Sequence, residues 1–515
     1  MERYKSNIVG IDLGTTNTLI GCYDEIGRRG ECLVSQDGTD LTPSAVYFDS
    51  PEVYTVGAVA REGALLHPDR TAMYFKRQMG KVKVTLTVDG KRFSPQQISA
   101  LVLKEVKESG ENELEKKITD AVITVPAYFN SDARKATIEA GTMSGLNVRA
   151  LLDEPVAALY HCDATNDLKG KTVLVFDLGG GTTDVLVASV TDKEVNEIAI
   201  DGDLDLGGSD WDQELIRYIK AKYLTGRTLE ADDEQNLLMG VERAKISLSK
   251  KENTMLTVST AQGRVQVKLT RKEFEKCTEH LLKRAEDILK NILKDSARQG
   301  VKKIDKVLLV GGASKMPQIT DMITALIPHV DVISKDPDEA VARGAAVYAK
   351  LLFENNEDKK GWLIKKSFES QAKNLNRIST RSYGTDFRSS DGKIKIWNMI
   401  YKGESLPASK TETFYTESYN QKTVSLEVYE STSVDRIMDK TNGHLLGKSS
   451  LLLPPGTPKG AKIEVLMTLD ENGVLSISGI DLKSGKGVKA VMESHALLGD
   501  KVEELREEIN IMTSK

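Results

Sequence analysis

The sequence predicts a chain of two unlike parts, a mixed α/β part over about residues 8–352 and a β-sheet part over about residues 377–491. Three observations support this division. Apolar strand-like runs alternate with helical patterns in the first part, and one strand–loop–strand pattern occurs there twice. The second part shows apolar–polar alternation interrupted by Gly, Pro and Asn-Gly turns. At 515 residues the chain exceeds one ordinary hydrophobic core, so about three or four compact units are expected.

Composition and charge are those of a globular protein. Hydrophobic residues make up 40% of the chain and charged residues 29%, which counts against a disordered or fibrous protein. The net charge of −5 gives no general attraction to polyanions, and no local basic patch is apparent. We therefore expect no nucleic-acid binding.

Cysteine spacing and the first residues favour a cytoplasmic protein. The four cysteines form neither a CxxC pair nor a zinc pattern, so reduced thiols are expected. The polar start lacks the apolar segment of a secretory signal, and no apolar run reaches the roughly 20 residues that cross a bilayer. We expect a cytoplasmic location without membrane association.

The repeated pattern is an apolar strand, an Asp-x-Gly loop rich in threonine, and a second strand. Its copies span residues 8–22 and 173–190. Neither copy has the GK[ST] of a Walker loop, and neither is the GxGxxG of a dinucleotide-binding fold. Two similar halves that face one cleft would explain the repetition. The loop residues are Asp12, Gly14, Thr15 and Thr16 in the first copy and Asp177, Gly179, Gly180, Gly181, Thr182 and Thr183 in the second.

These loops have the chemistry of a phosphate clamp. Glycine lets backbone N–H groups approach a phosphate, and threonine adds hydroxyls. Asp12 and Asp177 end two buried strands and, converging from opposite halves, suit a Mg²⁺ ion that keeps several of its waters. One such loop alone is better explained as a structural turn, because Gly-Thr turns are common. The occurrence of two favours a nucleotide-phosphate site.

Five further blocks, in a fixed order, resemble one known family. The most specific block reads AVITVPAYF at residues 121–129 and continues through Arg134 to LDEPVAA at residues 152–158. Together the blocks resemble the DnaK-type heat-shock protein 70 chaperones, a branch of the actin-like ATPase superfamily, over about residues 6–490. The other blocks read FKRQMG at residues 75–80, LGGSD at residues 206–210, VGGASKMP at residues 310–317 and PDEAVA at residues 337–342.

The resemblance implies a fold and a division into domains. Residues 1–353 would form an α/β actin-like ATPase domain of two lobes, built on duplicated ribonuclease-H-like halves. Residues 354–376 would be a linker, polar except for WLI at residues 362–364. Residues 377–491 would form a β-sandwich substrate-binding domain for peptides.

The end of the chain and the linker depart from the family. Residues 492–515 are too few for the family's helical lid, and they predict one short amphipathic C-terminal helix in its place. The apolar side of that helix would carry Val502, Leu505, Ile509 and Met512. The family's linker is an aliphatic run ending in an acid, which docks on the ATPase domain. Here we expect docking that is weaker or that uses different contacts, rapid peptide release even with ADP, and a smaller effect of ATP on peptide affinity.

The resemblance assigns five residues to catalysis of ATP hydrolysis to ADP and phosphate. Asp12 and Asp177 would organise Mg²⁺ largely through waters, with K⁺ as a further candidate ion. Lys76 would contact the γ-phosphate and the attacking water, Thr182 would touch the γ-phosphate, and Glu154 would position the water shell. Phosphoryl transfer depends on alignment and charge neutralisation, which this set supplies. Taken alone, Lys76 is more often a solvated surface lysine, and Glu154 is equally a helix N-terminal acid.

Further residues match the family's nucleotide pocket. Glu242, Lys245 and Ser249 fall on one face of a predicted helix and match the adenosine-binding helix, although an exposed helix face is the alternative. Lys315 stands where the family usually has an arginine on the adenine, and lysine cannot stack as a plane, so weaker nucleotide affinity is expected. The remaining matched residues are Gly207, Gly208, Gly311, Gly312 and Asp338.

In the β-sheet part, family position favours Phe414, Val424 and Leu426 as the lining of a pocket for an apolar peptide side chain. Core burial alone explains this alternating pattern about as well. Glu417 lies where a small residue is usual, which leaves the peptide preference open.

The expected function is that of an ATP-dependent chaperone of the stress response, which binds unfolded polypeptides and works with a J-domain co-chaperone and a GrpE-type nucleotide exchange factor. Two other classes of protein fit the sequence less well. A small-molecule kinase on the same fold leaves the β-sheet part unexplained and shows no sugar-binding set. A cytoskeletal or non-hydrolysing binding protein would not need the complete catalytic set.

Overall fold

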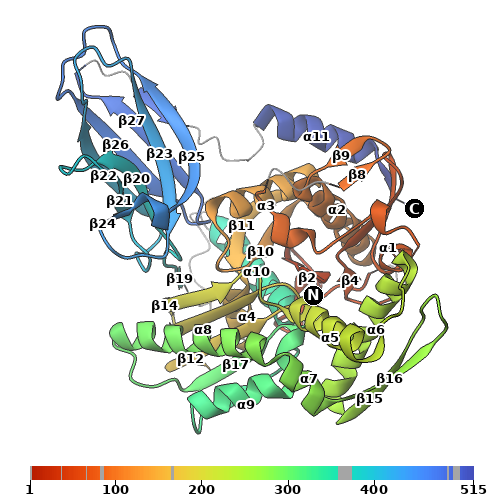
Figure 1. Ribbon diagram of the computed structural model, residues 1–515. Coiled ribbons are helices and arrows are strands. Elements are labelled where there is room, and N and C mark those ends of the chain that lie inside the picture. Colours follow the sequence, from red (N-terminus) through yellow and green to blue (C-terminus); the bar gives the residue numbers. More distant parts are fainter. Residues whose placement is uncertain are drawn as a thin grey trace.

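The computed structural model describes residues 3–35, 38–64, 66–81, 86–163, 168–357, 374–483, 487–490 and 499–514. Two α/β lobes face each other, and a β-sandwich lies beside them (Figure 1). None of the described helices is long and apolar enough to span a membrane. The apolar patch predicted at residues 362–364 lies outside the described residues.

Each lobe is centred on a six-stranded sheet. The first sheet contains β1 (Ile8–Leu13), β2 (Asn17–Asp24), β3 (Arg29–Cys32), β4 (Thr42–Pro43), β10 (Asp120–Val125) and β11 (Asn147–Asp153). The second contains β12 (Lys171–Leu178), β13 (Thr183–Val190), β14 (Glu194–Asp203), β17 (Lys306–Val310), β18 (Asp331–Ile333) and β19 (Asn374–Asn376).

Five strands of each sheet are equivalent in order and direction. The first runs β11-β10-β1-β2-β3, with β4 beside β2, and the second runs β18-β17-β12-β13-β14-β19. β1 is parallel to β10 and antiparallel to β2, just as β12 is parallel to β17 and antiparallel to β13. The equivalence agrees with the repeated sequence pattern, whose copies form β1–β2 and β12–β13.

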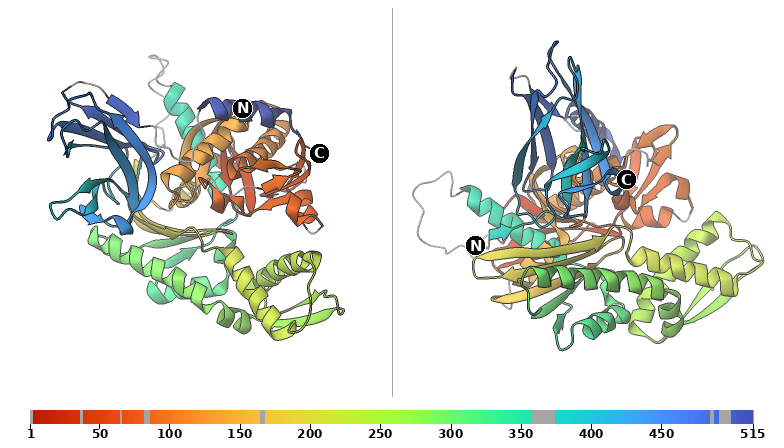
Figure 2. Two further views of the ribbon diagram at one scale, coloured as in Figure 1. Left: turned by 45° about the horizontal axis from the view of Figure 1, so that its top comes forward. Right: turned by 60° about the vertical axis from the view of Figure 1, so that its left-hand side comes forward.

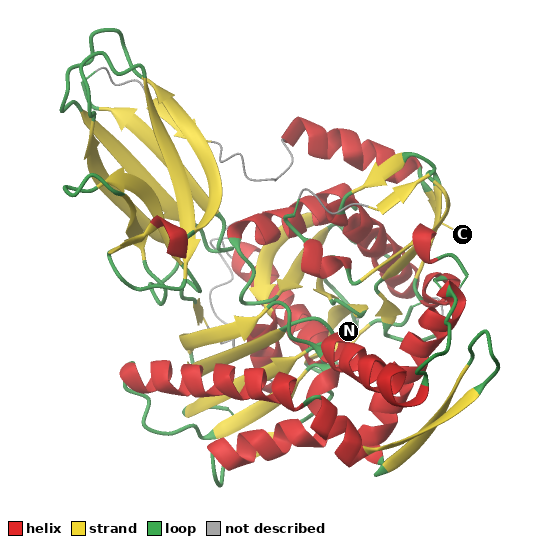
Figure 3. Ribbon diagram, viewed as in Figure 1, coloured by secondary structure: helices red, strands yellow, loops and turns green. Residues whose placement is uncertain are grey.

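Helices lie against the sheets of both lobes (Figure 3), and α2 (Pro95–Leu114) shows how the sequence sets a helix start. The side chain of Ser94 accepts a hydrogen bond from Gln97 N at the start of the helix over residues 95–114, and the Gln97 side chain accepts one from Ser94 N in return. The helices of the two lobes are α1 (Ala58–Gly63), α2 (Pro95–Leu114), α3 (Ser131–Met143), α4 (Glu154–Asp163), α5 (Gly208–Tyr223), α6 (Ala231–Lys250), α7 (Arg271–Cys277), α8 (Glu279–Arg298), α9 (Pro317–Leu326) and α10 (Ala340–Glu357).

Smaller sheets extend both lobes. β5, β6 and β7 form a sheet with the last strand, β29, while β8 pairs with β9 and β15 pairs with β16. Their bounds are β5 (Ala45–Ser50), β6 (Val53–Val56), β7 (Thr71–Met73), β8 (Leu86–Val88), β9 (Lys91–Phe93), β15 (Asn253–Val258), β16 (Val265–Thr270) and β29 (Thr513–Ser514). Short 3-10 helices lie at Pro68–Arg70, Phe75–Gln78, Gly312–Lys315 and Lys440–Asn442.

The β-sandwich consists of two sheets that share one apolar core. One sheet runs β24-β21-β20-β23-β25 and the other β22-β26-β27-β28. Leu426 and Val428 of the first sheet are buried with Ile463 and Val465 of the second. The strands are β20 (Ser382–Arg388), β21 (Ile394–Ile400), β22 (Ala408–Tyr415), β23 (Thr423–Ser431), β24 (Ile437–Asp439), β25 (His444–Leu452), β26 (Lys462–Leu469), β27 (Leu475–Asp481) and β28 (Gly487–Ala490).

The β-sandwich touches the first lobe through the turn between β26 and β27. Asn472 accepts hydrogen bonds at its backbone oxygen from Arg134 (3.3 Å) and at its side-chain oxygen from Leu151 N (2.9 Å). Leu475 N donates to Ser131 Oγ at 2.9 Å. On the chain leading into the sandwich, β19 adds to the second lobe as a parallel edge strand beside β14.

The last helix, α11 (Gly499–Ile511), lies on the first lobe against α3 and α2 (Figure 2). Val502, Ile509 and Met512 are buried, and Leu505 packs against the same core. The predicted amphipathic side is therefore the side that faces protein.

Candidate active site

The two repeated loops face each other between the lobes. Asp12 and Asp177 stand at the ends of the equivalent strands β1 and β12. A Cβ atom on Gly180 would lie 2.0 Å from Thr16 Oγ1, and one on Gly181 would lie 2.4 Å from Thr15 Oγ1. Only glycine allows the second loop to approach the first so closely.

Lys76 and Glu154 form a buried ion pair beside these loops. Lys76 lies on the 3-10 helix Phe75–Gln78, Glu154 is the first residue of α4, and the two are 3% and 7% exposed. Burial by itself would lower the pKa of Lys76, but the carboxylates of Glu154 and Asp12 raise it above its ordinary value. The lysine is therefore held as a cation, and a surface position is excluded.

Four carboxyl groups gather around this single lysine. Burial, and next the charge of Glu154, raise the pKa of Asp12 to about 7, although Thr124 Oγ1 donates to Asp12 at 3.0 Å. The same two causes raise the pKa of Asp177 and of Asp184 well above the ordinary value. One ammonium group cannot neutralise four carboxylates, so Asp12, Asp177 and Asp184 tend to take up protons, and a bound cation would favour their ionised forms instead.

Asp184 was not singled out from the sequence. It follows the second loop directly, on β13, and its Oδ1 accepts a hydrogen bond from Tyr128 N at 3.1 Å. The available signal was an acid immediately after the Gly-Gly-Gly-Thr-Thr run.

The donor set of this cluster fits Mg²⁺. Its ligands are carboxylate oxygens, which a hard cation prefers, and Mg²⁺ usually keeps several waters. In the described part of the chain, no three of these carboxyl groups bring oxygens within 4.8 Å of one another. Asp12, Asp177 and Asp184 would therefore hold the ion largely through water.

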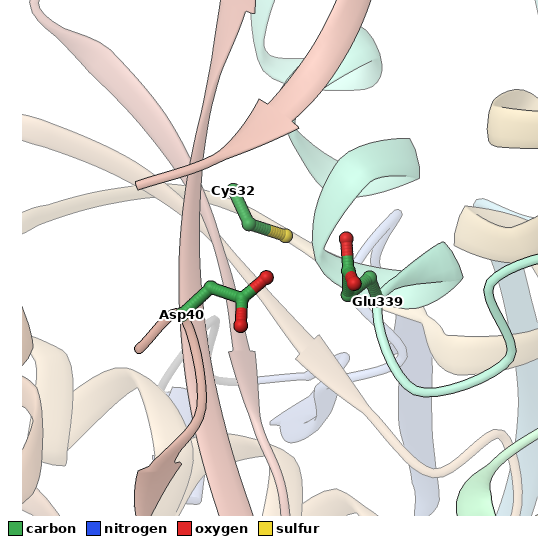
Figure 4. A group of neighbouring side chains, drawn as sticks. All are labelled: Cys32, Asp40 and Glu339. Atoms are coloured by element: carbon green, nitrogen blue, oxygen red, sulfur yellow. The ribbon is translucent and has the colours of Figure 1, made fainter. Parts of the chain in front are cut away.

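One other group of side chains does meet that distance. Cys32, Asp40 and Glu339 converge from β3, the loop after it and the turn just before α10 (Figure 4). Arg343 is ion-paired with Glu339 and supplies positive charge beside the group. Burial, together with the charge of Glu339, raises the pKa of the Cys32 thiol to about 12, which favours the neutral thiol. We assign no metal to this group.

The second loop is hydrogen-bonded to the start of α5. Gly208 N donates to Gly179 O at 2.9 Å, so the positive end of the α5 dipole adjoins the glycines of the loop. Thr182 is buried in this loop. The neighbouring Thr183 hydroxyl donates to Leu206 O at 2.7 Å, so it is engaged in a hydrogen bond to the protein backbone.

The residues matched to the adenosine side have partners within the protein. Lys245 donates to Gly208 O at 2.8 Å and to Asp212 at 2.7 Å, and Ser249 Oγ donates to Lys245 O at 3.1 Å. Lys315 is ion-paired with Asp338. The two Lys245 bonds join α6 to the start of α5.

Gly311 and Gly312 follow β17 next to Asp177. Gly311 has a φ of 78°, and a Cβ atom there would lie 2.4 Å from Leu178 O and 2.6 Å from Asp177 Oδ1. A side chain at this position would displace the loop that carries Asp177. Gly312 adjoins Asp338.

Two arginines, which sequence reasoning missed, connect the lobes across the site. Arg77 follows Lys76 and donates to Gly181 O at 2.7 Å and to Asp210. Arg61 on α1 is ion-paired with Glu242 on α6. Their partners are more than a hundred residues away in sequence, so no local pattern reveals them.

The three residues predicted to bind peptide lie in one cluster of the β-sandwich. Leu426 is 4% exposed and belongs to the core, while Phe414 and Val424 are half-buried and pack against it. Leu426 lies between the sheets, since its Cδ1 would be 3.0 Å from a Cβ atom on Gly479 of β27.

The chain matches a known protein family. A family model described as Hsp70 protein matches residues 8–85 and 80–515, which is nearly the whole chain.

Proposed function

Since the chain belongs to the Hsp70 protein family, we propose that it is an ATP-dependent molecular chaperone in which ATP hydrolysis controls the affinity of the β-sandwich for extended apolar peptide segments. The lobes would be the two halves of an actin-like ATPase, each ribonuclease-H-like, as their equivalent sheets suggest. The observation that carries this proposal is the pair of facing loops with Lys76, Glu154 and the carboxyl cluster between them.

The residues of this site suit in-line attack of water on the γ-phosphorus, which forms a new P–O bond and breaks the bond to the bridging oxygen of ADP. Backbone N–H groups of the two loops would hold the phosphates, and Thr182 would contact the γ-phosphate. Lys76, fixed by Glu154, would orient the attacking water and offset developing negative charge. Mg²⁺, when bound through Asp12, Asp177 and Asp184, would supply the remaining charge neutralisation.

We further infer that the adenosine lies along α6, with Glu242, Lys245 and Ser249 on one side and Gly311, Gly312, Lys315 and Asp338 on the other. Two ion pairs, Arg61–Glu242 and Lys315–Asp338, would have to open for Glu242, Lys315 and Asp338 to contact the nucleotide. The peptide pocket would be lined by Phe414 and Val424, with the more deeply buried Leu426 as its floor.

The proposed partners are unfolded polypeptides, a J-domain co-chaperone and a GrpE-type exchange factor, and the proposed location is the cytoplasm. Turnover of Mg-ATP, measured with and without an unfolded apolar peptide and a J-domain protein, tests the function. Hydrolysis that is stimulated by peptide supports a chaperone. Hydrolysis that requires a small phosphoryl acceptor instead would indicate a kinase.

A further inference from the structure

The C-terminal segment, residues 499–514, is packed as part of the first lobe. Ile509 is 1% exposed and Met512 4%, and they share a core with Phe48 and Tyr54 of β5 and β6. Ile511, on the other side of α11, is 80% exposed. The helix therefore buries one apolar side in the lobe and presents a polar side to solvent.

Polar contacts fix the end of α11. Lys104 on α2 donates to the backbone oxygens of Ile509 (3.1 Å) and Met512 (3.2 Å). A lysine at this position donates hydrogen bonds to carbonyls at the helix end, and its positive charge interacts favourably with the negative end of the helix dipole. Glu508 is ion-paired with Lys91 of β9.

The residues after α11 complete a sheet. β29 pairs with β6 in parallel, with Thr513 opposite Val53 and Ser514 opposite Tyr54. Thr513 N donates to Glu52 O at 3.0 Å, and Ser514 Oγ donates to Glu105 at 3.0 Å. In the described sheet β29-β6-β5-β7, this strand covers an edge of β6 that would otherwise be open.

That sheet leads directly to the active site. α1, which carries Arg61, follows β6, and the 3-10 helix with Lys76 and Arg77 follows β7. A segment that secures β6 therefore also secures the part of the lobe that presents the catalytic lysine.

We propose that residues 499–514 are a permanent structural element of the ATPase domain, an intramolecular clamp that stays docked in every nucleotide state. The surface formed by α2, α3 and β6 is covered by this chain's own C-terminal segment. The β-sandwich is consequently held to the ATPase domain at both ends, through β19 and through α11.

Hydrogen exchange of the full chain tests whether residues 499–514 stay docked in every nucleotide state. The amides of residues 499–514 are expected to be protected as strongly as those of α2 without nucleotide, with ADP and with ATP. Exchange of this segment at the rate of an unfolded peptide in any of these states would overturn the clamp. The readout does not depend on hydrolysis or peptide binding, so it stands apart from the proposed chaperone activity.

A matched pair of variants tests the packing. Ile509→Asp should lower the melting temperature of the ATPase domain by about 5 °C or more, whereas Ile511→Asp should change it by about 1 °C or less. Equal melting temperatures would contradict the packing. If Ile509→Asp does not fold, Lys104→Gln serves in its place: exchange of residues 509–514 should become at least about tenfold faster, and unchanged exchange would contradict the docking.

Discussion

Arg377, on the chain entering the β-sandwich, donates to the Asp153 carboxylate of the first lobe at 2.6 Å, and Asp153 is the residue before Glu154. Arg134 holds the other oxygen of Asp153 at 2.8 Å. Arg377 also donates to Glu471 O at 2.5 Å, in the turn that contacts the lobe. The charge of the arginines keeps the pKa of Asp153 below its usual range despite burial, so this joint is ionic.

Removal of this bond should uncouple the two domains. Because Arg377 connects the sandwich to the residue next to Glu154, Arg377→Met should reduce peptide stimulation of ATP turnover at least about fivefold, the lower end of ordinary coupling. The control is Arg388→Met, which removes an exposed ion pair to Glu417 within the sandwich. Equal stimulation in both variants would show that this joint does not carry the coupling.

The catalytic assignment predicts large losses of turnover. Lys76→Ala or Asp177→Asn should lower ATP hydrolysis by roughly 10²-fold or more, as is typical for an electrostatic catalytic group. Lys81→Ala, at an exposed lysine five positions further on, should retain turnover. Normal hydrolysis by both active-site variants, measured as phosphate release, would refute the assignment.

The peptide site can be tested separately from the ATPase. Val424→Phe overfills the proposed pocket and should weaken binding of a labelled apolar peptide, with basal hydrolysis nearly intact. Val434→Phe, at a valine 65% exposed, is the matched control. If fluorescence anisotropy gives the same affinity for both folded variants, Val424 is a core residue and not a pocket residue.

Stability should fall with rising pH because of Glu197 on β14, which accepts a hydrogen bond from Ile378 N at 2.8 Å. Burial, aided by the charge of Asp153, raises the pKa of Glu197 to about 8. The folded state therefore binds a proton that the unfolded state releases near pH 4.5, so this contribution is complete below pH 4.5 and is lost as pH rises to about 8.

Calorimetry between about pH 5 and pH 8 checks the effect. The melting temperature of the wild type should fall relative to that of Glu197→Gln over this range. Glu194→Gln, on the same strand, should follow the wild type. Parallel profiles for the wild type and Glu197→Gln would contradict the raised pKa.

Local sequence patterns indicated the two facing loops of the candidate site because each loop is a continuous stretch of sequence. The Asp-x-Gly-Thr runs specify both a tight turn and its chemistry, and the structure brings both copies together. Arg61, Arg77 and Arg377 could not be predicted, because each acts on a partner brought near only by tertiary packing. An arginine is expected at the surface, so the sequence did not indicate that Arg377 is buried.

The C-terminal helix shows the same limit. The spacing of Val502, Leu505, Ile509 and Met512 predicted a buried side, and the structure confirms it. Periodicity does not identify the surface that covers such a side, so the first lobe could not be inferred. The linker shows the same limit. Its residues Asn374–Asn376 pair with β14 through the backbone, and the few apolar residues of the linker did not indicate this pairing.

Release of a fluorescent apolar peptide, followed by stopped flow after mixing with ADP or ATP, tests most directly whether the nucleotide controls peptide affinity. A docked β19 and the Arg377–Asp153 joint give ATP a route to the sandwich, while a clamped α11 limits its movement. We predict rapid release with ADP and a measurable acceleration by ATP that stays below about a hundredfold, or some 2.7 kcal/mol of coupling. Slow release with ADP that ATP accelerates more than about a hundredfold would contradict the limited coupling, and identical release rates would contradict ATP control of peptide binding.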